Sequence, residues 1–111
     1  MNVYTVKLTR QAEEQLSEIA WYITVVLCNP DAADSLMEKL DTQLDKIGTN
    51  PDRYPLVDEE PWRSECVRWT TVGHYLVYFW TDIENAAVQI TGVVYEKRDQ
   101  KRFLDKMSFS D

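Results

Sequence analysis

The chain has 111 residues, with 19 acidic and 12 basic side chains and a formal net charge of −7. This length predicts one domain over residues 1–111, large enough to bury a core without disulfide or metal support. The excess of acid excludes a protein that coats nucleic acid through bulk electrostatics, because phosphate binding depends on Lys and Arg releasing counterions.

The charge is unevenly distributed along the chain. Residues 1–60 carry five basic and twelve acidic side chains, whereas residues 61–111 carry seven of each, which leaves room for basic clusters in the second half. The N-terminus lacks a basic stretch followed by an apolar one, and the apolar segments are far shorter than the roughly 20 residues that span a bilayer. We therefore expect a soluble cytoplasmic protein with no membrane partner.

The N-terminal region predicts a strand followed by two helices. Residues 3–8 alternate with the period of a strand, and Thr9 can cap a helix that begins there. Asn29-Pro30 ends that helix and starts the next, which Gly48 can close in a left-handed C-cap. Two apolar stripes at helical spacing are expected to form ordinary core: Ala12, Leu16, Ile19, Ala20 and Ile23, then Ala33, Leu36, Met37, Leu40, Leu44 and Ile47.

The segment over residues 49–62 cannot form a regular element, because it contains three prolines and the acidic run 58–60. Its large apolar side chains would be wasted in a flexible linker. We therefore expect an ordered connection that lies against the sheet and flanks a groove. The side chains in question are Tyr54, Leu56, Val57 and Trp62.

The remaining chain predicts three strands and a short helix. Residues 66–71, 74–80 and 87–94 alternate as strands of a meander, with turns at Val72-Gly73 and at residues 82–85. Residues 100–107 have the spacing of a short helix that docks lightly. The order β-α-α-β-β-β, with a short C-terminal helix, predicts an α+β fold: an antiparallel sheet with an N-terminal helical hairpin packed on one face.

The segment YEKRD, residues 95–99, follows the last predicted strand. The strand pairing delivers its charged side chains to one end of the sheet, where loops carry binding and catalytic residues in many folds. Cys28 and Cys66 share no CxxC or Cys/His spacing, so both are expected to be reduced thiols, with no metal site and no cofactor. Function should therefore be sought at the sheet end.

Four segments, taken with the element order, resemble the RelE/ParE family, the small toxins of bacterial type II toxin-antitoxin modules. They are YTVKLTRQAEEQL, NPDRYPLVDEEPW, VRWTTVGHYLVYF and YEKRD, and together they cover nearly the whole chain. The combination is specific, although no single segment is. The resemblance implies a single toxin domain over residues 1–111, linked to plasmid stabilisation and neutralised by a cognate antitoxin.

The family has two branches with different targets. RelE-like members cut mRNA in the ribosomal A site without a metal, and ParE-like members are described as poisons of DNA gyrase that need no nuclease centre. The resemblance implies first a metal-independent, ribosome-dependent mRNA endoribonuclease, with ribosome and mRNA as partners. The alternatives are a non-enzymatic ParE-like gyrase inhibitor and a degenerate, non-toxic member. Operator DNA would be bound by the antitoxin, since this chain has no helix-turn-helix or basic stripe.

The RelE pattern is only partly matched. Arg68 falls on a basic position of the second strand, and the pair Lys97-Arg98 falls on the basic pair after the last strand. Two further basic positions fall on Cys66 and Tyr75, and the terminal tyrosine position falls on Leu104. The set of nuclease residues that the resemblance implies is therefore incomplete.

Cleavage of RNA by its own 2′-hydroxyl places extra negative charge on phosphorus, and fixed guanidinium groups lower that barrier. We predict Arg68 and Arg98 as holders of this charge, with Lys97 as a third catalytic cation. His74 is the one histidine and is predicted to transfer protons, because imidazole titrates near neutral pH. The residues predicted to contact RNA are Arg63, Tyr75, Tyr95, Lys101 and Arg102.

Each of these residues has a plainer interpretation. His74 would be an exposed turn residue, and Arg68 would form a cross-strand ion pair with Glu96 or Glu65. The basic residues between 97 and 102 would be the charged start of a helix, and the acidic run 58–60 a solvated turn. Four aromatic residues either stack on bases or fill the core and the antitoxin groove: Trp62, Trp69, Tyr78 and Trp80.

Overall fold

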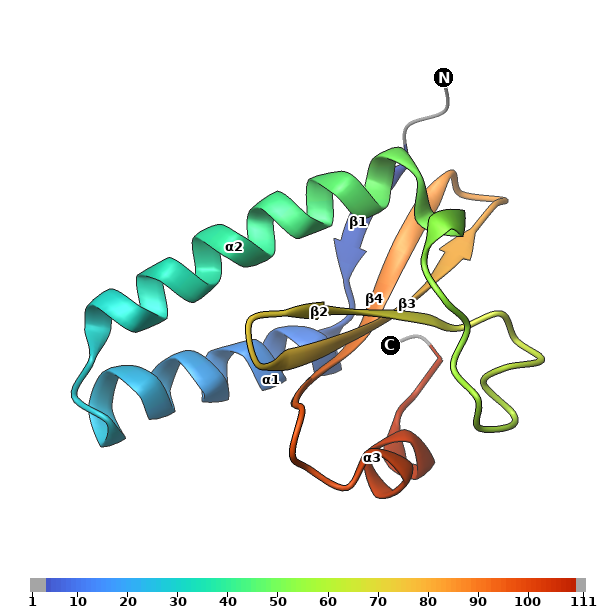
Figure 1. Cartoon of the computed structure of the whole chain (residues 1–111). Helices are drawn as coiled ribbons and strands as arrows, with labels where there is room; N and C mark the ends of the chain where they lie inside the picture. The colour runs from blue at the N-terminus through green and yellow to red at the C-terminus, as the bar shows by residue number, and fades with distance from the viewer. Residues whose placement is uncertain (1–3, 110–111) are drawn as a thin grey trace.

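The computed structural model describes residues 4–109. The elements, in chain order, are β1 (Thr5–Leu8), α1 (Arg10–Trp21), α2 (Pro30–Thr49), β2 (Arg68–Val72), β3 (Tyr75–Asp82), β4 (Ala87–Tyr95) and α3 (Gln100–Lys106) (Figure 1). This order confirms the predicted α+β class, the β-α-α-β-β-β layout and the short C-terminal helix.

The sheet has the strand order β1-β4-β3-β2. β2 pairs with β3 and β3 with β4 in antiparallel fashion, but β1 lies parallel to β4, with Thr5 opposite Ala87. The expected antiparallel sheet therefore includes one parallel pair. Two parallel strands need a long connection between them. The connection from β1 to β4 starts with the helical hairpin, which covers one face of the sheet.

The predicted starts of both long helices are confirmed. The Thr9 hydroxyl accepts a hydrogen bond from the Ala12 amide at 3.3 Å, and the Asn29 side chain accepts one from the Ala32 amide at 3.1 Å. Beyond Trp21 the first helix continues as a π-helical turn over Tyr22–Val26. This extension carries the hairpin tip past the sheet and leaves large apolar side chains exposed there: Trp21, Tyr22, Val25, Val26 and Leu27.

Gly48 does not close α2, because the helix continues to Thr49. Its role is close packing instead. A Cβ atom at this position would lie 2.9 Å from Val6 Cγ2 and 3.0 Å from the Tyr4 carbonyl oxygen, and the Tyr4 amide donates a hydrogen bond to the Gly48 carbonyl at 2.9 Å. The absent side chain therefore lets α2 lie directly against β1.

We expect Gly48→Ala to destabilise the fold by about 1–3 kcal/mol, the usual cost of overpacking, although alanine favours a helix interior by about 1 kcal/mol over glycine. The backbone oxygen of Tyr4 cannot move away as a flexible side chain would. Urea unfolding measures the change, with Ser17→Ala on the exposed face of α1 as the control. An unfolding free energy equal to or above the parent's would contradict this packing role.

The helix-side core lies between the sheet and the two long helices. Odd-numbered positions of β3 face it, with Val77 and Phe79 fully buried. Most of the predicted helical stripe residues join it or pack against its edge, which confirms their assignment as core. Its buried members are Ala12, Leu16, Leu40, Ile47, Val72, Val77, Phe79, Val88, Ile90 and Val93.

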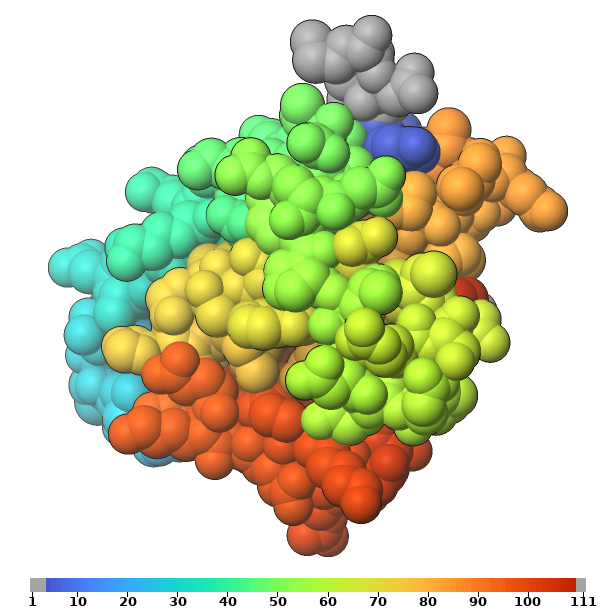
Figure 2. Space-filling view, turned by 45° about the vertical axis from the view of Figure 1, so that its right-hand side comes forward, coloured from blue at the N-terminus to red at the C-terminus, as the bar shows by residue number. Residues whose placement is uncertain are grey.

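The loop-side core covers the opposite face of the sheet. The connection over residues 55–67 and the segment 100–109 lie together on that face (Figure 2). The Trp62 indole donates a hydrogen bond to the Leu104 carbonyl at 3.0 Å, and Leu104 itself is 1% exposed. The expectation of a lightly docked helix was wrong, because Leu104 of α3 is buried in this core and Phe103 packs against it. The buried members of the core are Val57, Val67, Tyr78, Val94, Leu104 and Met107.

A β-bulge in β4 decides which residues reach each core. Phe79 pairs with Ile90 and Tyr78 pairs with Gly92, so Thr91 is the extra residue, and its hydroxyl donates to the Tyr78 carbonyl at 3.3 Å. The strict alternation expected over residues 87–94 therefore breaks at this point. Without the bulge, Val93 would face the loop-side core instead of the helix-side core.

The ionisation of Tyr78 is expected to lower the stability of the fold at alkaline pH. Burial, with a contribution from the Glu59 carboxylate, raises the pKa of Tyr78 to about 12, and its hydroxyl donates to Gln100 Oε1 at 2.7 Å. The neutral phenol is thus favoured in the folded state, so its stabilisation is complete below about pH 10, the ordinary pKa, and is lost as the pH rises through 12.

We expect the unfolding free energy to fall by up to ~1.4 kcal/mol per pH unit between pH 10 and 12 on account of this group. Tyr78→Phe should show a shallower slope, measured by urea unfolding at each pH. Tyr22→Phe, at a half-exposed ring, is the control. Equal slopes for the parent and Tyr78→Phe would contradict the assignment.

Candidate functional site

The sheet end predicted to carry the site joins the β2–β3 turn to the segment after β4. Gly73 takes a positive φ of 58°, which a tight turn requires, and His74 follows it in the turn rather than in β3. His74 Nδ1 lies 2.9 Å from Glu96 Oε1, and the Glu96 amide donates to the His74 carbonyl at 2.8 Å. The structure therefore places His74 beside the YEKRD segment, as a side chain that is 78% exposed.

Two tyrosines extend this end of the sheet toward the helical hairpin. Tyr75 and Tyr95 are partners in the β3–β4 register, and their ring centroids lie 5.7 Å apart in an edge-on arrangement. Burial, together with the hydroxyls of Tyr95 and Tyr22, raises the pKa of Tyr75. Both predicted RNA-contacting tyrosines thus lie next to His74, and Tyr95 is 40% exposed.

Four basic residues after β4 are exposed in the turn before α3 or in its first turn: Lys97, Arg98, Lys101 and Arg102. The Asp99 carboxylate caps α3 by accepting a hydrogen bond from the Arg102 amide at 3.1 Å. The Gln100 side chain donates to three carbonyls of the turn, which fixes its path. Within residues 4–109, Lys97 and Arg98 form no ion pair, so their cations face solvent.

Arg68 lies elsewhere. It begins β2, so about 13 Å of strand separates it from Val72 at the turn, at ~3.3 Å per residue. Its guanidinium donates to the Tyr54 carbonyl at 2.6 Å and lies 3.9 Å from Asp52, and the side chain is 22% exposed. Arg68 is therefore held by the connection after α2; the expected partners, Glu96 and Glu65, do not pair with it.

Arg63 is also separate from the sheet end. It lies in the connection between α2 and β2, where its guanidinium is 3.4 Å from Asp58 and 3.5 Å from the Val57 carbonyl. The structure thus brings together His74, Tyr75, Tyr95, Lys97 and Arg98, with Lys101 and Arg102 at the start of the adjoining helix. It does not bring Arg63 or Arg68 to that cluster, and the catalytic and RNA-binding roles of all these residues stay predictions.

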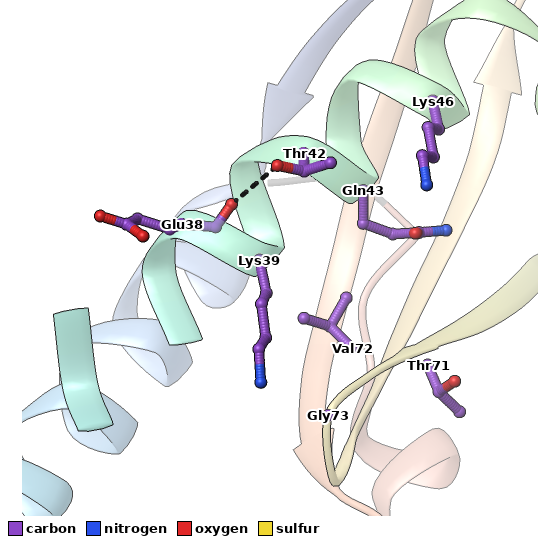
Figure 3. A pocket seen from close by; sticks show the side chains of 8 residues that line it. All are labelled: Glu38, Lys39, Thr42, Gln43, Lys46, Thr71, Val72 and Gly73. Atoms are coloured by element: carbon purple, nitrogen blue, oxygen red, sulfur yellow. Dashed lines mark hydrogen bonds between the residues drawn. The ribbon is translucent and has the colours of Figure 1, made fainter. Parts of the chain in front are cut away.

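Sequence reasoning missed a groove of about 420 Å³ between α2 and the end of β2 (Figure 3). Lys39 and Lys46 line it from α2, with Gln43 between them. The signal was present, since residues 39, 43 and 46 share one face of a helix by their spacing. The remaining lining residues are Glu38, Thr42, Thr71, Val72 and Gly73.

The described residues hold no cluster of three or more His, Cys, Asp or Glu side chains that could bind a metal ion. Across residues 4–109, none of the helices is both long and apolar enough to cross a membrane. Both cysteines are free thiols at exposed positions, Cys28 at the hairpin tip and Cys66 before β2.

Residues 6–102 match the family described as the ParE toxin of type II toxin-antitoxin system, parDE. The chain belongs to the ParE toxin family. The match spans the helical hairpin, the sheet and the first residues of α3, and so includes His74, Tyr95, Lys97 and Arg98. It confirms the resemblance found in the sequence, at the level of a toxin of the ParE/RelE superfamily.

Two solved structures share the fold of this ParE-family chain. One belongs to the chromosomal ParDE TA system from P. aeruginosa: the identity is 19%, the match covers 86% of this chain and 98% of the other, and the TM-score is 0.67. The other belongs to the toxin-antitoxin complex RelBE2 from Mycobacterium tuberculosis, with 19% identity, coverage of 84% and 98%, and a TM-score of 0.59. A comparison with curated proteins gives no match.

Proposed function

We propose that this ParE-family chain is a toxin that arrests growth by binding its target, DNA gyrase, rather than by cutting mRNA. The observation that carries the proposal is the separation of Arg68 from the pair Lys97-Arg98. Cleavage through a phosphorane needs cations that converge on one phosphate and are already positioned for it. Here the Arg68 guanidinium instead holds the Tyr54 carbonyl at the far end of β2.

Two other positions, one before β2 and one at the sheet end, support the same proposal. Two positions that are basic in the RelE pattern hold Cys66 and Tyr75, and Tyr75 packs against Tyr95 instead of presenting a charge. Tyr95 is left exposed beside the cations of Lys97 and Arg98. An exposed tyrosine beside an arginine is typical of a protein-binding surface with a small number of dominant contacts. We assign target binding to this surface.

The proposed function includes an antitoxin partner and a cytoplasmic location. Both solved relatives come from toxin-antitoxin systems, which supports an antitoxin for this chain as well. The apolar side chains left exposed at the hairpin tip provide contact area for such a partner. A disordered segment of the antitoxin would lose conformational entropy when it orders on binding, and contact with these apolar side chains would offset that loss.

The test is pulse-labelling of cells just after the chain is induced without a partner, following methionine and thymidine incorporation side by side. We expect thymidine incorporation to fall first, and the purified chain to inhibit supercoiling by gyrase while leaving translating mRNA intact. An early fall in methionine incorporation with cut mRNA would overturn the gyrase proposal. Normal growth on induction would instead identify a non-toxic family member.

A ribosome-dependent endoribonuclease is the second candidate, and one observation favours it. The His74–Glu96 hydrogen bond of 2.9 Å orients an imidazole whose other nitrogen is left for proton transfer, and Lys97 and Arg98 follow Glu96 directly. A carboxylate that orients a histidine is a common arrangement for general base catalysis. On this reading His74→Gln would abolish mRNA cleavage by the purified chain on translating ribosomes.

A further inference from the structure

The groove between α2 and the end of β2 gathers positive charge on its helix side. Lys39 and Lys46 line it, and Figure 3 shows both side chains extending toward β2. Within residues 4–109 neither ammonium group forms an ion pair. The groove therefore holds two cations that the protein does not neutralise, in the half of the chain that is otherwise strongly acidic.

The acidic residues of α2 near these lysines are directed away from the groove. In an α-helix, Glu38, Asp41 and Asp45 lie roughly 100–160° around the axis from Lys39. Figure 3 shows the Glu38 carboxylate pointing away from β2, although the residue borders the groove. Between Lys39 and Lys46, a stretch that the structure describes in full, the groove side of α2 thus presents positive charge and no carboxylate.

The strand side of the groove adds two neutral donors. The Thr71 hydroxyl and the Gly73 amide border the groove, and neither donates a hydrogen bond to any other described residue. Both residues are exposed, so a ligand can reach them. Gln43 links the two sides, because its side-chain amide donates to the Tyr54 hydroxyl at 3.1 Å and to the Thr70 hydroxyl at 3.3 Å. The spacing between α2 and β2 is therefore fixed at the groove.

The kinds of donor and their spacing indicate the kind of ligand. Ammonium, hydroxyl and backbone amide groups are the donors with which proteins commonly contact phosphate. Seven helical residues place Lys39 and Lys46 about 10 Å apart along the axis, so a ligand that meets both needs more than one anionic centre. The volume of about 420 Å³ lies within the range of small-molecule sites, roughly 300–1,000 Å³. These features describe a site for a compact polyanion.

We propose that this groove binds the phosphate chain of a di- or triphosphate, either free or as part of a nucleotide. Lys39 and Lys46 contact different phosphate groups of the chain. The Thr71 hydroxyl and the Gly73 amide donate hydrogen bonds to its oxygens from the strand side. The site goes beyond the proposed function, since none of these four residues belongs to the surface assigned to target binding.

A nucleic acid strand is a poorer occupant of the same groove. Such a strand continues past the two lysines and would approach the carboxylates of Glu38, Asp41 and Asp45 on the neighbouring side of α2. The net charge of −7 also repels a long polyanion more strongly than a short one. A compact phosphate chain meets the two cations and ends before it reaches the acidic side chains.

The test titrates inorganic triphosphate into the ¹⁵N-labelled full chain in the absence of divalent metal ions, which would compete for the ligand. We expect the amide signals of Thr71 and Gly73 to shift, and binding to weaken as salt is added. The thermal unfolding midpoint should rise with the concentration of triphosphate, because the ligand binds the folded chain. Citrate, a polyanion without phosphate, should bind more weakly.

A matched pair of double variants separates the groove from a general attraction for anions. Lys39→Gln with Lys46→Gln should weaken triphosphate binding on the order of tenfold or more, because both charge-assisted contacts are lost. Lys7→Gln with Lys106→Gln removes the same charge outside the groove and should leave the dissociation constant nearly unchanged. Urea unfolding verifies that both double variants are folded.

ATP identifies the source of the ligand. Tighter binding of ATP than of triphosphate would assign the groove to a nucleotide, and equal or weaker binding would assign it to the phosphate chain alone; both results support the proposal. Equal binding of citrate, equal weakening in the two double variants, or no shift at millimolar triphosphate would overturn it. A short oligothymidylate that binds more tightly at the same residues would also overturn it, by assigning the groove to nucleic acid. Because no readout involves growth arrest, the site and the proposed function can fail separately.

Discussion

Replacing both Lys97 and Arg98 with alanine is expected to abolish growth arrest while leaving the unfolding midpoint unchanged. Both side chains are exposed and form no ion pair within residues 4–109, so the fold loses nothing when they are removed. Dominant interface residues each contribute about 2 kcal/mol or more to binding. Plating efficiency after induction measures the loss, and urea unfolding of the purified variant verifies the fold.

Arg68→Ala is the matched comparison, with the opposite expected result. Its guanidinium satisfies the Tyr54 carbonyl, so removal should cost about 1.5–3 kcal/mol of stability, as for hydrogen bonds from charged groups. Growth arrest should persist at temperatures where the variant stays folded. Relief of toxicity by a folded Arg68→Ala variant, with Lys97→Ala/Arg98→Ala still toxic, would contradict the assignment of the binding surface.

Leu104→Ala is expected to have the largest effect on stability, a loss of about 2–5 kcal/mol, because it opens a cavity in the loop-side core. Leu104 is 1% exposed, and its carbonyl accepts the Trp62 indole hydrogen bond. A helix of seven residues is not stable alone, so α3 depends on this packing. Urea unfolding measures the loss.

The matched control is Lys101→Ala, an exposed position of the same helix that should unfold at the parent's midpoint. Tryptophan fluorescence adds a second readout, because Trp62 and Trp80 pack against the loop-side core together with Phe103 of α3 and Phe109. An unchanged unfolding free energy for Leu104→Ala would mean that α3 does not contribute to the core.

Local signals in the sequence were enough to place most elements. Thr9 and Asn29 are helix caps whose side chains bond within three residues, so they can be recognised without any tertiary structure. The turn at Gly73 is similar, because its positive φ favours glycine. The apolar stripes of the two long helices follow from helical periodicity alone, and most of their residues lie in the core or pack against it, as predicted.

The errors arose where tertiary contacts override local preference. Glycine is common just after the end of a helix, and for this reason Gly48 was expected to close α2. The close contact with Val6 and the Tyr4 carbonyl explains instead why this position holds a glycine. The parallel placement of β1 beside β4 depends on pairing between residues about eighty positions apart. Arg68 was assigned to the catalytic set from its residue type and its position in the strand. Neither of these reveals the hydrogen bond to the Tyr54 carbonyl that holds its guanidinium.

The bulge at Thr91 also affects how β4 is aligned with the corresponding strand of shorter or longer relatives. Thr91 is the extra residue that the bulge absorbs, so Gly92 and the residues after it have the partners and the faces that a regular strand one residue shorter would give them. A relative with one residue fewer in β4 would lose the bulge and its local bend, while the counterpart of Tyr95 would still pair with that of Tyr75. A gap at Thr91 in an alignment is thus compatible with the same surface at the end of the sheet, even though it changes the sequence alternation along β4.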